Sequence, residues 1–203
     1  MDYLEFLKQE FDFQKDNYDF FLEKSEKESK KTIISKGFLF DMRPFENEIA
    51  GFKKGKECQS FPKNTKNVIV YHFNDKEQII MIEEYGQAPN IINREFFIYA
   101  DNTLKSLYYS SGGNDLKSIR LSIFDKEKTI NVFNHGKYGI SIKKYIYEGE
   151  LLRKIQIKSK EFDDIDFSDS ELVFEYADNR ELEIITEVYP DEEPRELYPD
   201  FIK

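Results

Sequence analysis

The spacing of hydrophobic and polar positions changes once along the chain, near residue 67. From residue 2 to about residue 30, apolar side chains recur three, four and seven positions apart with charged residues between them, which is the period of an amphipathic helix. The positions concerned are Leu4, Leu7, Phe11, Tyr18, Phe21 and Leu22. We therefore predict one helix in this segment, or two helices separated by a break near Phe13.

Residues 67–189 instead carry short runs of β-branched and aromatic residues, separated by Asp, Asn, Gly and Lys, which is the pattern of strands joined by turns. The connections between the runs are mostly too short for crossover helices, so neighbouring strands are expected to pair antiparallel as a meander. The predicted strands are residues 68–73, 78–84, 94–99, 104–109, 117–124, 129–133, 140–147, 151–158, 172–176 and 182–189.

The rest of the chain gives weaker signals. In residues 32–66, Gly and Pro interrupt the apolar pieces, so we predict an irregular region with one short strand at 38–40. Residues 190–203 form an acidic tail with three prolines. We predict a single domain over residues 1–203, of class α+β. In it the helical segment 1–31 packs on a large curved antiparallel sheet, which is open rather than closed into a barrel and has a concave face free for binding.

Five strand ends share a weak repeat, in which large apolar residues lead into a polar turn, at intervals of about 24 to 29 residues. The five segments are residues 71–75, 97–102, 121–125, 145–149 and 174–179. Any meander of such hairpins gives similar spacing, so chance and a true repeat both stay open. The clearest segments are Phe97-x-Tyr99-x-Asp101-Asn102-x-Leu104-x-x-Leu107 and Tyr145-x-Tyr147-x-Gly149, the second followed by Leu151 and Ile155. They resemble the hairpins of bacterial YD and MORN-like repeats, including those of immunity proteins in polymorphic toxin systems. The resemblance spans at most residues 67–189, and this sequence lacks the family's regular glycines and repeated Tyr-Asp pair. The resemblance implies a sheet that binds a partner.

Charge and composition narrow the possible partners and the compartment. The chain has 40 acidic and 30 basic residues and therefore a formal charge of −10. This charge opposes binding to nucleic acid and favours a cationic partner. Alternatively, it only keeps the protein soluble. The single Cys58 allows no internal disulfide and fits a reducing compartment. No window resembles a membrane span or a secretory signal. We therefore expect a cytoplasmic protein.

The residues that most often carry chemistry form no recognisable motif. We expect His135 to be a hairpin turn residue, His72 to lie on the wetter face of its strand, and Cys58 to be a bystander thiol. The pair Gly112-Gly113 links two strands, so we interpret it as a turn rather than a phosphate loop. We accordingly predict no catalytic residues, no cofactor and no metal site.

One acidic segment, residues 161–171, interrupts the hairpin rhythm and is expected to be a solvated loop rather than a calcium site, because it lacks the central Gly and the ligand spacing of a calcium loop. We expect Phe162 and Phe167 to pack back on the domain. The predicted contacts to a basic partner are Asp163, Asp164, Asp166, Asp169 and Glu171.

The leading functional hypothesis is a non-enzymatic, protein-binding domain, and most concretely an immunity protein that blocks a cognate bacterial toxin sterically, with charge steering toward a basic cleft. Two alternatives stay open. One is a calycin-like carrier that holds an apolar ligand inside a closed barrel, and the other is an enzyme whose carboxylate site has no linear motif.

Overall fold

The computed structural model describes residues 2–86 and 90–199 of the chain. These residues form one 13-stranded sheet accompanied by three helices. The helices are α1 (Tyr3–Gln14), α2 (Tyr18–Glu28) and α3 (Glu46–Ile49). The strands are β1 (Lys31–Lys36), β2 (Lys56–Cys58), β3 (Val68–Phe73), β4 (Ile79–Tyr85), β5 (Ile92–Ala100), β6 (Thr103–Ser110), β7 (Asp115–Asp125), β8 (Lys128–Gly136), β9 (Gly139–Glu148), β10 (Leu151–Glu161), β11 (Ser168–Tyr176), β12 (Leu182–Val188) and β13 (Arg195–Tyr198).

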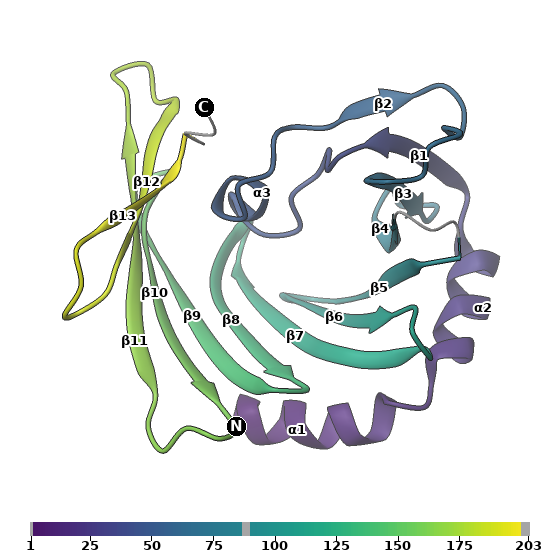
Figure 1. Cartoon of the computed structure of the whole chain (residues 1–203), viewed down its shortest axis with the longest axis horizontal. Helices are drawn as coiled ribbons and strands as arrows, with labels where there is room; N and C mark the ends of the chain where they lie inside the picture. Colours follow the sequence, from purple (N-terminus) through teal and green to yellow (C-terminus); the bar gives the residue numbers. More distant parts are fainter. Residues whose placement is uncertain (1, 87–89, 200–203) are drawn as a thin grey trace.

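All neighbouring strands pair antiparallel, in the order β13-β12-β11-β10-β9-β8-β7-β6-β5-β4-β3-β1-β2. From β3 to β13 each strand pairs with the next one in the chain, which confirms the predicted meander. The sheet curves strongly but stays open, and its edge strands β13 and β2 do not pair with each other (Figure 1). The α+β fold with an open sheet is therefore confirmed, and the closed barrel required by the carrier alternative is not formed.

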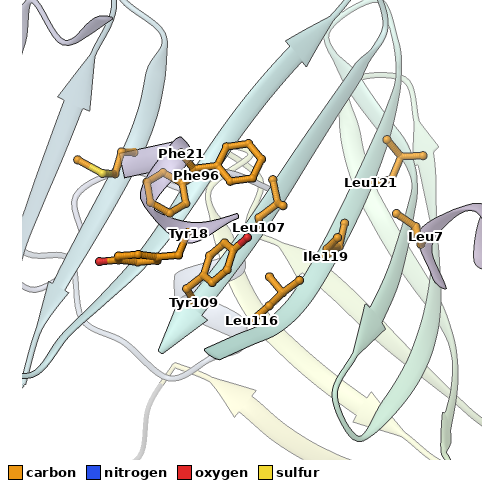
Figure 2. Packing of buried hydrophobic residues seen from close by; sticks show 10 residues of the cluster. Leu7, Tyr18, Phe21, Phe96, Leu107, Tyr109, Leu116, Ile119 and Leu121 are labelled. Atoms are coloured by element: carbon orange, nitrogen blue, oxygen red, sulfur yellow. The ribbon is translucent and has the colours of Figure 1, made fainter. Parts of the chain in front are cut away.

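Helices α1 and α2 lie along the convex face of the sheet (Figure 1). The chain breaks between them at residues 15–17, slightly beyond the break predicted near Phe13. Both helices bury their apolar stripes against the convex side of β4–β8, because that side supplies the apolar residues that cover them. Figure 2 shows the resulting cluster, which contains Leu7, Tyr18, Phe21, Met81, Phe96, Leu107, Tyr109, Leu116, Ile119 and Leu121.

Residues 37–55, which include α3, cross the concave face of the sheet, and we call them the crossing segment. Figure 1 shows α3 inside the curve of the sheet. Phe38, Leu39 and Met42 pack on inward-facing residues of β3–β6, whereas Phe45 and Ile49 pack on those of β8–β12. The concave face, which was expected to be free, is therefore covered at both flanks by the chain's own apolar side chains. Its middle stays polar.

The structure corrects three predicted boundaries. No strand forms at 38–40, and the strands of that region are β1 and β2, which carry several lysines and therefore lack a clear apolar alternation. The acidic tail contributes β13, which pairs with β12; residues 200–203 lie outside the described part. The acidic segment is not only a loop, because β11 begins at Ser168 and pairs with β10 in register.

The five repeat segments all lie on odd-numbered strands, from β3 to β11, at the ends that lead into hairpin turns. Their first residues do not share one face. Tyr71, Phe97, Tyr145 and Phe174 belong to the concave clusters, whereas Leu121 packs beneath the helices. The sequence similarity between these segments therefore follows hairpin rhythm rather than a repeated side-chain environment.

Candidate functional site

The middle of the concave face is hollowed into a groove of about 600 Å³, which we call the concave groove. It runs from the crossing segment to the ends of β8–β11. Such a volume is within the range of small-molecule pockets, which is about 300 to 1,000 Å³. Its lining includes Arg43, Glu46, Lys117, Ser118, Arg120, Asn134, Tyr138, Ser141, Lys143, Ser159, Lys160, Glu161, Asp164 and Ser168.

The floor of the concave groove is a row of polar residues placed directly opposite one another across six strands, from β6 to β11. The row consists of Ser106, Arg120, Asn134, Ser141, Ser159 and Ser168. Residues paired directly across antiparallel strands project from the same face of a sheet. This polar row therefore gives the groove a floor of hydroxyl, amide and guanidinium groups.

Four charged residues tie the crossing segment to this floor, and we call them the charge network: Arg43, Glu46, Glu95 and Arg120. The Nη1 of Arg43 lies 3.0 Å from Glu46 Oε1, and its Nη2 donates to Ser106 Oγ at 2.8 Å. Arg120 Nη1 lies 3.2 Å from the same Glu46 oxygen. Glu95 Oε1 lies 3.6 Å from Arg43 Nη2 and 3.8 Å from Arg120 Nη1. Burial favours a higher pKa for Glu46, but Arg43, Arg120 and Lys143 outweigh it and hold the pKa below its usual value.

A further carboxyl group, that of Glu84, lies beside the charge network on β4. Burial, and then repulsion from Glu95, raise the pKa of Glu84 to about 7, although Tyr108 and Arg120 favour its charged form. Tyr108 OH donates to Glu84 Oε2 at 3.4 Å. Glu84 is thus a group of this face that changes charge near neutral pH.

Replacing Glu84 with glutamine should make the protein more stable at high pH and leave it nearly unchanged at low pH. A carboxyl group whose pKa is raised in the folded state stabilises the fold while it is protonated. That contribution is lost as the pH rises from the pKa of the unfolded state, about 4.5, through the pKa of the folded state, about 7. We expect Glu84→Gln to gain about 2 to 3 kcal/mol relative to wild type at pH 8 and little at pH 4.5. Urea unfolding at both pH values, with the exposed Glu192→Gln as control, measures this. An equal difference at both pH values would contradict it.

The open end of the concave groove meets the turns of two neighbouring hairpins. We call Tyr138 and residues 162–167 the hairpin tip. Phe162 N–H donates to Tyr138 O at 3.0 Å, so the β8–β9 and β10–β11 turns are joined. Four large side chains are exposed here: Tyr138 by 70%, Phe162 by 50%, Ile165 by 90% and Phe167 by 40%. The tip is therefore an apolar surface at the end of the sheet.

The five predicted partner-binding carboxylates divide into two groups. Asp163, Asp164 and Asp166 are exposed within the hairpin tip, where Asp164 Oδ2 accepts a hydrogen bond from Glu161 N–H at 3.1 Å. Asp169 and Glu171 lie on β11 and pair with lysines of β10. Asp169 Oδ1 is 3.5 Å from Lys158 Nζ, and Glu171 Oε2 is 2.6 Å from Lys154 Nζ. The structure therefore brings three of the five together with the exposed apolar residues and neutralises the other two locally.

Phe162 and Phe167 were expected to pack on the domain. The ring of Phe162 is 5.5 Å from that of His135, yet half of Phe162 stays exposed, as does much of Phe167. His135 is not a turn residue as predicted. It is a buried residue of β8, and its ring also packs against Phe11 of α1.

The other residues with possible chemistry have ordinary surroundings. His72 Nε2 is 3.2 Å from Glu83 Oε2, which also pairs with Arg94. Cys58 lies on the edge strand β2. In the described part of the chain, no three His, Cys, Asp or Glu side chains are grouped so that they could hold a metal ion. None of the helices in that part has both the length and the apolar character that a membrane crossing needs.

No protein-family model, no curated protein and no solved structure matches the chain.

Sequence reasoning missed the groove, although one signal was present. The signal is the alternation on β7 of the polar residues Ser118, Arg120 and Ser122 with the apolar residues Ile119 and Leu121. This alternation predicts that the polar set faces one side of the sheet and the apolar set the other. A polar residue at each inward position indicates a face that does not belong to an apolar core.

Proposed function

We propose that this protein is a non-enzymatic, protein-binding domain that uses the hairpin tip to contact a basic partner. The observation that carries the proposal is the combination, in two adjoining turns, of four exposed large apolar residues with Asp163, Asp164 and Asp166. Protein interfaces commonly combine apolar anchors with a polar rim. The overall charge of −10 supports a cationic partner, because complementary charge accelerates the encounter of two proteins.

In its most specific form, the proposal is that the partner is a bacterial toxin and that this protein is its immunity protein. The hairpin tip lies at one end of a large sheet (Figure 1), a position suited to entering and blocking a cleft. Support comes from the resemblance of the hairpins to those of immunity proteins and from the acidic tip, which complements a cleft built to hold a polyanionic substrate. Inhibition would then be steric, with charge acting on the rate of association.

A comparison of three baits tests the proposal. The first is wild type, the second is Asp163→Lys/Asp164→Lys/Asp166→Lys, and the third is Asp178→Lys/Glu181→Lys/Glu183→Lys. The third has the same change in charge but alters the β11–β12 hairpin, which lies at the opposite end of β11 (Figure 1). We expect wild type and the third bait to capture the same basic protein from an extract of the source cells, and the tip variant to lose it.

Capture of that protein by all three baits, or its loss from both variants, would contradict a role for the hairpin tip. Growth of cells that express the captured protein, with and without this chain, then tests the immunity form separately. Rescue of growth by wild type but not by the tip variant is the expected result. A captured protein that is harmless would leave partner binding standing and remove the toxin.

A further inference from the structure

The concave groove has features of a ligand site that partner binding by the hairpin tip does not use. The polar row occupies inward-facing positions where a sheet of this curvature would otherwise continue its apolar core. Its two ends differ in burial, because Ser106 is 1% exposed whereas Ser168 is exposed. A buried polar surface is unfavourable unless its groups are hydrogen-bonded. The crossing segment satisfies part of this row through Arg43, and the part beyond Arg120 opens into the groove.

One cation of the groove, Lys143, has no partner. It projects from β9 into the groove, is partly buried, and forms no ion pair or hydrogen bond with any other residue in the described ranges 2–86 and 90–199. Burial lowers the pKa of Lys143, and Arg120 and Arg43 lower it further, against the opposing effect of Glu46 and Glu187. A buried charge is stable when it is paired, so an anion beside Lys143 would supply the missing partner.

The other charges of the groove leave it positive. Arg43 and Arg120 are balanced by Glu46 and Glu95 within the charge network. Lys117 and Lys137 share the single carboxylate of Asp115, at 2.7 and 2.8 Å. Lys160 donates to the Ile165 carbonyl rather than to a carboxylate. Two opposing carboxylates lie at the open end of the groove: that of Asp164, which belongs to the hairpin tip, and that of Glu161, which adjoins it. A positive interior in a protein of charge −10 is a local feature that favours a small anion.

The groove also contains an unused hydrogen-bond acceptor. Asn134 Oδ1 is buried and has no hydrogen-bond partner among the described residues. Asn134 stands between Arg120 and Ser141 in the polar row. Leaving such an acceptor unpaired costs about 1 to 3 kcal/mol, and rotation of the Asn134 amide toward the groove would let an O–H or N–H donor of a ligand recover this energy.

We infer that the concave groove binds a small, hydroxylated oxyanion, with Lys143 contacting the anionic group and Asn134 accepting a hydrogen bond from a hydroxyl group of the ligand. The serine hydroxyls of the row, Ser118, Ser141 and Ser159, provide further donors. Both a phosphate monoester and a carboxylate have this chemistry. The site does not depend on the proposed partner, because Lys143 and Asn134 lie outside the hairpin tip.

Calorimetric titration of the full chain tests the site with four probes: ribose 5-phosphate, gluconate, ribose and inorganic phosphate. We expect ribose 5-phosphate or gluconate to bind more tightly than ribose or inorganic phosphate, because only the first two combine an anionic group with several hydroxyl groups. The stronger of the two identifies the anion. The inference would be overturned if neither ribose 5-phosphate nor gluconate bound wild type with a dissociation constant below about 10 mM. It would also be overturned if ribose bound as tightly as the better of these two anionic probes.

Two variants of Lys143 and one matched control locate the binding. Lys143→Met should weaken binding of the better probe at least about tenfold, because a charge-assisted hydrogen bond is lost, whereas Lys143→Arg should retain most of it. Lys154→Met removes a lysine of the neighbouring strand β10 that pairs with Glu171, and should bind as wild type does. Circular dichroism confirms that each variant is folded. Wild-type affinity in Lys143→Met would overturn the site.

A last arm separates a small-molecule site from a contact for an acidic partner segment. An acidic hexapeptide, Glu-Glu-Gly-Glu-Glu-Gly, is titrated against wild type and Lys143→Met. We expect it to bind more weakly than the better sugar probe, because it offers no hydroxyl group to Asn134. Tighter binding of the peptide, lost in Lys143→Met, would overturn the small-ligand proposal and assign the groove to a protein partner.

Discussion

Replacing Arg43 with methionine is expected to lower the free energy of unfolding by about 3 to 5 kcal/mol, because this change leaves Glu46 and Glu95 partly buried with a reduced positive charge beside them. The Arg43 side chain is only 5% exposed and joins the crossing segment to Ser106 on β6. Loss of this residue therefore removes two ion pairs and the hydrogen bond that fixes the segment across the concave face.

Urea unfolding of Arg43→Met measures this effect, and two further variants show its origin. Arg43→Lys keeps the charge but not the planar group that reaches several acceptors, so an intermediate loss is expected. Arg153→Met removes an arginine that is 42% exposed and pairs with Glu148 at the surface, and should change stability by less than about 1 kcal/mol. An Arg43→Met protein as stable as Arg153→Met would show that the charge network does not hold the crossing segment.

Replacing Phe21 with alanine should destabilise the protein by about 3 to 5 kcal/mol, because the loss of a buried ring leaves a cavity between α2 and the convex face. Phe21 is 5% exposed, and its ring stacks on that of Phe96, with the ring centroids 5.7 Å apart (Figure 2). The neighbouring Phe20 on the same helix is 60% exposed and is not a member of the buried cluster.

Phe20→Ala is therefore a matched control, since it makes the same chemical change one position away. We expect Phe20→Ala to change stability by less than about 1 kcal/mol. Chemical unfolding followed by circular dichroism gives both values. Equal destabilisation by the two substitutions would contradict the assignment of α2 as a helix that covers the sheet through one face only.

The strands from β3 to β12 were predictable because each has a local signal. Half-buried strands such as β7 alternate apolar with polar residues, and tight turns between them contain Gly, Asn or Asp. Three strands were not predicted at their positions: the edge strands β2 and β13, and β1, which lies between β2 and β3. Their sequences are short, contain charged residues and show no clear apolar alternation, and they are strands because a neighbouring strand pairs with them. Tertiary pairing overrides local preference in such strands.

The candidate site was predictable only in part, for a related reason. The three aspartates of the hairpin tip stand together in the sequence, so their shared exposure follows from local composition. Tyr138 reaches the same surface from a different hairpin, and no local pattern reveals that neighbour. The same holds for the charge network, because Arg43 lies 63 residues from Ser106 along the chain. Contacts of this kind are set by how the sheet curves and by the path of the crossing segment over it.

The claim that the hairpin tip is the partner-binding surface is tested most directly by the rate of association with the captured basic protein. The rate constant is measured for wild type and for Asp163→Lys/Asp164→Lys/Asp166→Lys, at low and at high salt, with circular dichroism showing that the variant is folded. We predict that the variant associates at least about tenfold more slowly at low salt and that the difference shrinks at high salt, because exposed charges act mainly through long-range steering. An unchanged association rate in the folded variant at low salt would contradict the claim.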